Sequence, residues 1–317
     1  MRTVHRLSAT VVLGWVVAGS PAADAQTNGT FCGLTRHHPR RYAHVVWIWL
    51  ENHGYEQIVG SPDAPYINAL IAGCGLATNF HNLTHASLPN YVGAVTGQPL
   101  SALLPFDGDC EPGPSCSTPA RSLFHQVSSW KAYMESMTTN CQPTGVVGYA
   151  VRHNPPAYLT SLPDCAAHDV PYEELQADLD ADTLPAFAFV TPNTVNDMHD
   201  GTDPAAIQAG DRWLEAELPK LLDSAAYRSG KTVVFVTFDE GETGPDYAIG
   251  EDCARNTSGD SCHIPTIVVS PSTPAGTSSG RLYSHYSLLK TTEQLLGIRG
   301  RLDLARRARS LRRPFGL

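Results

Sequence analysis

The sequence lacks a long hydrophobic run, an excess of basic residues and any C-x-x-C pair of cysteines. No segment approaches the roughly 18 consecutive apolar residues of a membrane-spanning helix, so stable membrane insertion is not expected. The chain has 22 basic and 31 acidic residues, a formal net charge of −9. This balance argues against a nucleic-acid ligand bound by broad phosphate neutralisation. The missing C-x-x-C pairs disfavour a structural zinc site.

What is present describes an exported globular protein. Of 317 residues, 42% are hydrophobic and 17% are charged, which excludes intrinsic disorder, collagen and coiled coil. Arg2 and Arg6 precede a short apolar stretch over 11–18 and then Ala23-Asp-Ala25. These features predict a signal peptide over 1–25 and secretion of the rest, since the apolar stretch is too short for an uncleaved anchor.

Eight cysteines, an even number in an exported chain, predict four disulfides. Eight cysteines allow 105 connectivities. Their spacing favours local closure, and the expected pairs are Cys110 with Cys116, Cys253 with Cys262, Cys141 with Cys165 and, as the remainder, Cys32 with Cys74.

Short apolar runs alternate with helical patterns along the chain. The predicted strands are His44–Leu50, Gly75–Phe80, Gly145–Val151, Ala186–Val190, Thr232–Phe238 and Ile264–Ser270. The predicted helices are Pro65–Ala72, Pro89–Thr96, Pro204–Asp223 and Tyr286–Leu296. This alternation predicts an α/β fold, with a mainly parallel, doubly wound sheet between helices, in a single domain over 26–317.

Polar residues follow three of the predicted strands. Glu51-Asn52-His53 follows the first, Asp239-Glu240 follows the fifth, and the segment 196–200, with Asp197 and His199, follows the fourth. Strand ends of a parallel sheet meet at one edge, where carboxylates repel one another unless a cation lies between them. We therefore expect a divalent metal ion, Ca²⁺, Mg²⁺, Mn²⁺ or Zn²⁺; solvated strand ends are the alternative.

Three further segments carry candidate residues. Ser87 lies where a helix begins, so the helix N-terminus could hold a phosphate beside its hydroxyl, or Ser87 could be an ordinary helix cap. Arg152 and His153 follow a predicted strand and suit a phosphoryl group, although both could be surface residues. His285 opens the last predicted helix.

Six segments in this order resemble the phosphoesterase family of the alkaline phosphatase superfamily, over roughly His44 to Leu296. They are Glu51-Asn-His53, His85-Ala-Ser87-Leu-Pro-Asn90-Tyr91, Arg152-His-Asn-Pro155, Pro192-Asn193 with Asn196-Asp-Met-His199-Asp-Gly201, Thr237-Phe-Asp239-Glu240-Gly241 and Ser284-His285-Tyr286. The resemblance implies a three-layer α/β/α sandwich of the alkaline phosphatase type.

The resemblance also implies roles for individual residues. Ser87 matches the phosphoryl-accepting nucleophile, and Asn90 matches a contact to the phosphate. Asn52 matches a metal ligand or a contact to the phosphate. The matched metal ligands are Glu51, Asp239 and Glu240. Asp197, His199 and His285 match positions that hold a second metal in two-metal relatives; without that metal, His199 or His285 could protonate the leaving group.

The prediction is a secreted, metal-dependent phosphomonoesterase of the acid phosphatase type, acting through a phosphoserine on soluble phosphomonoesters and phosphoinositides. A phospholipase C-type phosphodiesterase is the alternative, and a non-catalytic secreted binding protein is a third hypothesis. The segment 299–317 holds seven arginines and one acidic residue, Asp303. It could contact anionic lipid transiently or pair with the acidic body. The sequence does not define an oligomeric state.

Overall fold

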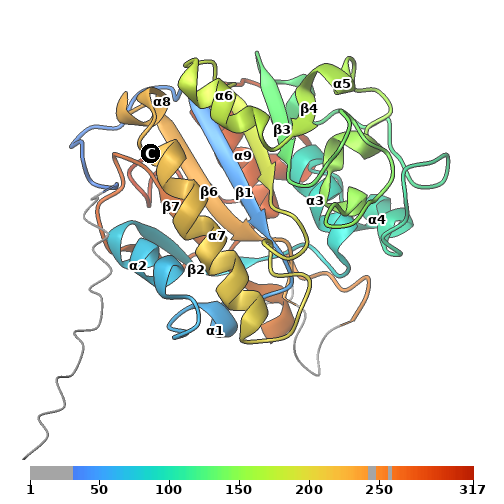
Figure 1. Ribbon diagram of the computed structural model, residues 1–317, viewed down its shortest axis with the longest axis horizontal. Coiled ribbons are helices and arrows are strands. Elements are labelled where there is room, and N and C mark those ends of the chain that lie inside the picture. The colour runs from blue at the N-terminus through green and yellow to red at the C-terminus, as the bar shows by residue number, and fades with distance from the viewer. Residues whose placement is uncertain (1–30, 242–247, 256–258) are drawn as a thin grey trace, which may run out of the picture.

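The described strands form one mixed sheet, drawn in Figure 1. The computed structural model describes residues 31–317 except 242–247 and 256–258, so the predicted signal peptide lies outside the described residues. The strand order is β4-β3-β5-β1-β6-β7-β2-β8, and β9 pairs with β2. Every pairing is parallel except those of β7, which runs antiparallel to β6 and β2. The bounds are β1 His44–Leu50, β2 Gly75–His81, β3 Trp130–Met134, β4 Asp169–Pro171, β5 Phe187–Thr191, β6 Thr232–Phe238, β7 His263–Val269, β8 Thr277–Ser279 and β9 Tyr283–Ser284.

The central strands consist almost entirely of β-branched and aromatic residues. Both β1 and β6 are buried along nearly their whole length, as expected of strands covered by helices on both faces. Trp47 of β1 lies opposite Phe189 of β5 and Phe235 of β6. This register determines which residues lie side by side where the neighbouring strands end, at the carboxyl edge of the sheet.

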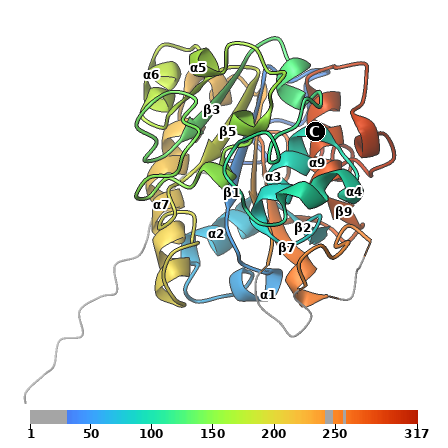
Figure 2. The same ribbon diagram turned by 90° about the vertical axis from the view of Figure 1, so that its right-hand side faces the viewer.

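Helices cover both faces of the sheet and complete a three-layer sandwich (Figure 2). The two longest on one face are α3 and α9, which contact each other, and α2 contacts α7 on the other face. Within the described ranges, no helix has both the length and the apolar character needed to cross a membrane. The α-helices are α1 Tyr55–Ile58, α2 Pro65–Gly73, α3 Ser87–Thr96, α4 Leu100–Leu103, α5 Cys165–His168, α6 Glu174–Asp180, α7 Ala205–Leu222, α8 Ala225–Arg228 and α9 His285–Leu295. The 3₁₀ helices are η1 Leu104–Phe106, η2 Leu123–His125, η3 Val151–His153, η4 Pro155–Tyr158, η5 Asp260–Cys262 and η6 Asp303–Arg306.

One predicted strand is wrong. The run Gly145–Val151 forms a tight turn closed by hydrogen bonds between Val146 and Tyr149, and η3 begins at its end. Gly148 takes a positive φ of 82° in that turn, a conformation that glycine adopts without strain. The sheet uses β3 instead, a five-residue strand beside β5 that the sequence analysis missed.

The four predicted disulfides are confirmed. The structure pairs Cys32 with Cys74, Cys110 with Cys116, Cys141 with Cys165 and Cys253 with Cys262. With all eight cysteines paired, no thiolate is available as a metal ligand.

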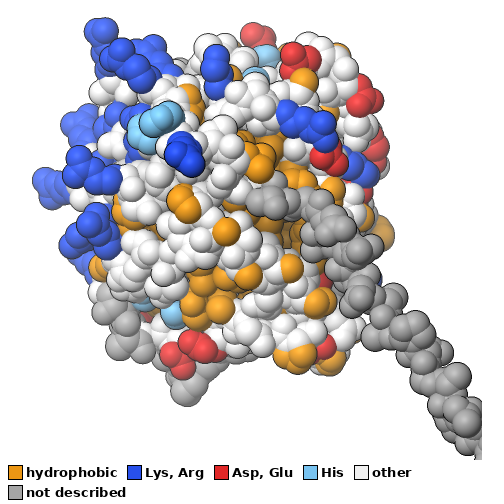
Figure 3. Space-filling view, turned by 90° about the vertical axis from the view of Figure 1, so that its left-hand side faces the viewer, with side chains coloured by type: hydrophobic (Ala, Val, Ile, Leu, Met, Phe, Trp, Pro, Cys, Tyr) orange, Lys and Arg blue, Asp and Glu red, His pale blue; other side chains and the backbone are white. Residues whose placement is uncertain are grey.

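The arginine-rich C-terminal segment, residues 299–317, packs along α9. Leu311 and Phe315 are buried, and Leu311 N donates to Oγ1 of Thr291 in α9 (2.9 Å). Lys and Arg side chains gather along one side of the molecule in Figure 3. The segment is therefore part of the folded body, although its arginines give that side its charge.

Candidate active site

Glu51 and Asp239 lie next to each other because β1 and β6 end in register. Leu50 and Phe238 are paired, and Asp239 N donates to Leu50 O (2.9 Å), so the next residue of each strand is a carboxylate at the same edge. Asn52 N donates to Asp239 Oδ1 (3.1 Å). Both carboxylates are fully buried. The predicted convergence of these two strand ends is present in the structure.

Asp197 joins them from the loop after β5. Its backbone oxygen accepts a hydrogen bond from Glu51 N (2.7 Å), which joins this loop to the end of β1. His199 N donates to Asp197 Oδ1 (2.8 Å) and orients the carboxylate. Asp197 is also fully buried, so three carboxylates from three segments meet inside the protein.

His153 lies among these carboxylates. Its Nδ1 is 3.1 Å from Asp197 Oδ2, and its Nε2 is 3.4 Å from Glu51 Oε2. One ligand atom from each of Glu51, His153 and Asp197 lies within 4.8 Å of the others. From sequence, His153 is expected beside Arg152 as a phosphate contact, but η3 turns the two side chains apart and buries the imidazole.

Burial governs the protonation of this cluster. It raises the pKa of Glu51 well above the ordinary value, and the charges of Asp239 and Asp197 raise it further. Burial likewise raises the pKa of Asp239 to about 6 and raises that of Asp197. Burial and the nearby Arg152 lower the pKa of His153, so its ring is neutral.

These residues fit a divalent cation. Asp239 Oδ2 and His153 Nε2 are buried and make no hydrogen bond to any described residue. Carboxylate oxygens and a neutral imidazole nitrogen are ligands for hard or borderline metal ions. A bound cation would satisfy both atoms and neutralise carboxylates that otherwise repel one another. The candidate ligands are therefore Glu51, His153, Asp197 and Asp239.

Ser87 is the first residue of α3, two residues before the predicted helix start. Its Oγ donates to Glu51 Oε2 (3.0 Å) and lies 3.4 Å from Glu240 Oε1. From the next turn of α3, the Tyr91 hydroxyl donates to Glu51 Oε1. The serine hydroxyl thus faces two carboxylates at the positive end of a helix.

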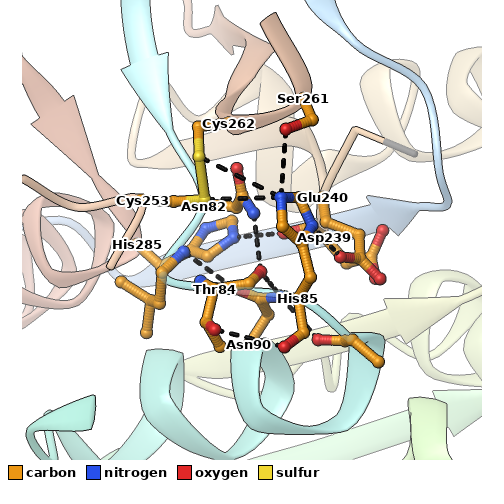
Figure 4. Close-up of a disulfide and its surroundings, with 12 residues drawn as sticks. Asn82, Thr84, His85, Asn90, Asp239, Glu240, Cys253, Ser261, Cys262 and His285 are labelled. Carbon is orange, nitrogen blue, oxygen red and sulfur yellow. Dashed lines mark hydrogen bonds and ion pairs between the residues drawn. A yellow bond between two sulfur atoms is a disulfide. The ribbon is translucent and has the colours of Figure 1, made fainter. Parts of the chain in front are cut away.

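Glu240 is oriented by His85, which the sequence analysis did not select. Figure 4 shows the His85 ring between Glu240 and Ser261, next to the Cys253–Cys262 disulfide. Nδ1 of His85 pairs with Glu240 Oε2, and Nε2 lies 3.2 Å from Ser261 Oγ. Only its position two residues before Ser87 could have indicated His85 from sequence.

Asn90 and Asn52 differ in their surroundings. Asn90 Oδ1 accepts from the backbone N–H groups of Leu83 and Thr84, and its Nδ2 donates to the carbonyls of Thr84 and Ala86. These bonds hold the loop before Ser87 and occupy the amide predicted to contact phosphate. The Asn52 side-chain oxygen, in contrast, is buried without a hydrogen-bond partner in the described parts of the chain.

Arg152 and His199 meet at the rim. Arg152 donates from one terminal nitrogen to His199 Nε2 (2.8 Å), so the other ring nitrogen carries the hydrogen and donates to Asp200 Oδ1 (2.9 Å). On its other side, Arg152 Nε lies 3.7 Å from Asp109 Oδ2. Asp109, which the sequence analysis did not select, also accepts from Leu88 N in the first turn of α3 (2.9 Å).

His285 lies behind the carboxylates. Its Nε2 donates to the backbone oxygen of Asp239 (2.8 Å), and its ring packs against Trp49. The side chain is fully buried, and burial lowers its pKa to about 4. The structure thus places His285 beneath Asp239, away from His199 at the rim.

The family of the chain follows from its similarity to known proteins. The profile of the Phosphoesterase family matches residues 61–299. A phosphatidylinositol-3-phosphatase from Mycobacterium tuberculosis is 28% identical over 261 residues, which cover 81% of this chain and 78% of the relative. An acid phosphatase from Aspergillus fumigatus is 27% identical over 266 residues, 79% of this chain and 54% of the relative. The chain thus spans about half the length of that fungal relative.

Solved structures with the same fold are more distant in sequence. A protein of the alkaline phosphatase superfamily from Vibrio parahaemolyticus aligns with a TM-score of 0.57 at 13% identity, over 83% of this chain and 68% of that one. The lipoteichoic acid synthase LtaP from Listeria monocytogenes gives 0.57 at 11% identity, over 88% and 77%. They confirm the predicted alkaline phosphatase-like sandwich.

Proposed function

The chain belongs to the Phosphoesterase family and is a phosphoric ester hydrolase, and we propose that it hydrolyses phosphomonoesters through a phosphoserine on Ser87. The observation that carries this proposal is the Ser87 hydroxyl, 3.0 Å from Glu51 and beside the cluster of buried carboxylates and His153. Relatives named acid phosphatase and phosphatidylinositol-3-phosphatase support monoesters, including phosphoinositides, as substrates.

We assign metal dependence to the buried cluster. Glu51, His153, Asp197 and Asp239 would hold the ion, as their unsatisfied buried atoms suggest. When bound, a divalent cation polarises the phosphoryl group and favours the deprotonated serine hydroxyl. The other groups needed for the reaction belong to the protein itself.

In the proposed reaction, Ser87 Oγ attacks phosphorus, and the substrate alcohol leaves with a proton. The hydrogen of Ser87 Oγ already points to Glu51, and Glu240 lies on its other side, so a proton acceptor is in place. Arg152 at the rim can bind the non-bridging phosphate oxygens through its guanidinium fork. His199 Nε2 accepts from Arg152 in the free site. When Arg152 turns to the phosphate and Nε2 takes up a proton, His199 can protonate the leaving alcohol. Water then cleaves the phosphoserine and restores Ser87.

The proposal includes secretion. The sequence of residues 1–25 has the pattern of a signal peptide. Four disulfides suit an oxidising compartment.

The test is an assay of the protein on a phosphomonoester, a phosphodiester and a phosphoinositide, with chelator and with metal added back. We expect monoester and phosphoinositide turnover that chelation removes and one metal restores. Turnover of the diester alone would replace the proposal with a phospholipase C-type activity. No turnover with any metal would indicate a binding protein.

Ser87→Ala should abolish turnover and leave the fold intact. Ser101→Ala, which changes an exposed serine in α4, is the matched control and should keep full activity. Full activity of Ser87→Ala would remove Ser87 from the mechanism.

A further inference from the structure

Most arginines of the segment 299–317 form no ion pair with the described acidic residues of the body, contrary to one of the two expectations from sequence. Of the seven, only Arg301 forms an ion pair with a described aspartate or glutamate, with 3.7 Å between its Nε and Glu293 Oε2. Most of the others are exposed. Their charge is therefore available to an external anion.

Several of these arginines and their neighbours line an open hollow of about 690 Å³ on the surface, between α9 and the C-terminal segment. Its lining contains no aspartate or glutamate among the described residues. Six cationic side chains line it: Arg281, Lys290, Arg301, Arg309, Arg312 and Arg313. Ser87 does not line this hollow, so it is separate from the candidate active site.

Part of this lining is held in place by the backbone. Lys290 Nζ donates to the carbonyls of Ala308 (2.6 Å) and Arg306 (3.1 Å). Arg312 donates from Nε to Leu317 O and from a terminal nitrogen to Arg40 O, both at 3.0 Å. These bonds fix two cations in the wall of the hollow.

Three other cationic side chains of the lining have no partner among the described residues. These are Arg281, Arg309 and Arg313, which are exposed and whose guanidinium groups make no hydrogen bond or ion pair to the described residues. Six like charges around one hollow repel one another, and a multivalent anion would relieve that repulsion. Five of the six are arginines, whose planar forks match two oxygens of one phosphate group.

We propose that this hollow is a second, non-catalytic binding site for phosphate groups. The phosphates could belong to a soluble oligophosphate or to lipid headgroups, which present the same oxygens. The site adds an anchor for anions to a chain whose overall charge is negative. It does not depend on turnover at Ser87.

The experiment uses a Ser87→Ala chain, so that no probe is hydrolysed, with chelator present to keep the catalytic cluster free of metal. Tripolyphosphate is titrated calorimetrically into this parent and two triple variants at constant ionic strength. The hollow variant carries Arg281→Gln, Arg309→Gln and Arg313→Gln. The control variant carries Arg36→Gln, Arg212→Gln and Arg228→Gln, exposed arginines outside the lining that give the same change in charge.

We expect the hollow variant to bind at least roughly tenfold more weakly than the parent, since each lost guanidinium removes charge-assisted hydrogen bonds. The control should stay within about twofold, because its arginines lie outside the site. Equal weakening in both variants would reduce the effect to net charge and overturn the proposal. So would a parent that binds neither tripolyphosphate nor the vesicles below.

A second arm identifies the source of the phosphate. The same proteins are sedimented with vesicles of phosphatidylcholine alone or of equal parts phosphatidylcholine and phosphatidylglycerol. If the parent and the control variant bind the mixed vesicles and the hollow variant does not, lipid headgroups are supported as the ligand. If the hollow variant loses binding to tripolyphosphate but not to vesicles, a soluble ligand is supported. A version with lysine at the three positions keeps the charge but lacks the forks, and it should bind with intermediate affinity. Circular dichroism checks that all variants are folded.

Discussion

Nδ1 of His153 lies 3.1 Å from Oδ2 of Asp197, within a cluster of buried carboxylates. This position separates His153 from its sequence neighbour Arg152, which lies at the rim beside His199. The two residues therefore belong to different parts of the site. In the proposed reaction, His153 holds the metal and Arg152 binds the substrate phosphate.

His153→Ala should weaken metal binding by at least about tenfold, because it removes a neutral nitrogen ligand from the cluster. Calorimetric titration with Zn²⁺ or Mn²⁺ into chelator-treated protein measures this change. Arg152→Gln is the comparison, and it should raise KM for a phosphomonoester while metal affinity stays unchanged. A shift in metal affinity for Arg152→Gln, with none for His153→Ala, would reverse the two assignments.

Metal should stabilise the folded protein, because the cluster is assembled only in the native state. At a metal concentration of about 100 times Kd, the free energy of unfolding should rise by about 2.7 kcal/mol. Urea unfolding with and without metal measures the gain. Asp239→Asn should lose most of it. A stability independent of every divalent metal tested would contradict a metal site here.

Tyr91→Phe should destabilise the metal-free protein by about 1–3 kcal/mol, since the Tyr91 hydroxyl donates to the buried Glu51. The control is Tyr286→Phe, whose hydroxyl donates to the backbone oxygen of Gln98 (2.6 Å). Both variants should lose stability in urea, but only Tyr91→Phe should also change metal affinity. Equal metal affinities in the two variants would argue against a role for Tyr91 in orienting Glu51.

Asp169 should make stability depend on pH. Burial raises its pKa to about 7, whereas an unfolded aspartate has a pKa near 3.8. Between about pH 4 and pH 7 the Asp169 carboxyl is protonated in the folded state and ionised in the unfolded state. The resulting stabilisation of the folded state is complete below a pH of about 4 and is lost as the pH rises towards 7. Asp169 should thus contribute up to about 4 kcal/mol to the fall in the free energy of unfolding over this pH range, and Asp169→Asn should remove this contribution.

The measurement is the difference in free energy of unfolding between wild type and Asp169→Asn across this pH range. Other buried carboxylates titrate equally in both proteins and cancel in the difference. A constant difference at every pH would show that Asp169 ionises normally.

The sequence contained enough information for the central sheet and the carboxylates at its edge. Strands such as β1 and β6 are mostly apolar, and an acidic residue follows each of them directly. Both the strand and the carboxylate at its end could therefore be predicted from the sequence. Ser87 could be placed at a helix start because Pro89 follows in the first turn. The sequence was sufficient to predict those features whose structure is determined by the residues of a single segment.

The partners of these residues could not be read in the same way. His153 was grouped with Arg152 by adjacency, yet a single turn of 3₁₀ helix sends the two side chains in different directions. His85 and Asp109 support the site from loops whose course depends on tertiary contacts. The strand β3 contains Lys131, which interrupts its apolar pattern, and Gly145–Val151 looked more strand-like although its glycines form a turn.

The most direct test of the account is to trap the enzyme during turnover of a phosphomonoester. The reaction is quenched in acid, the protein is digested, and the peptides are analysed by mass spectrometry. The account predicts a phosphate on the Ser87 hydroxyl that disappears in Ser87→Ala and persists in Ser101→Ala. A fully active enzyme that carries no phosphate on Ser87, under conditions that trap one on a related serine-dependent phosphatase, would contradict it.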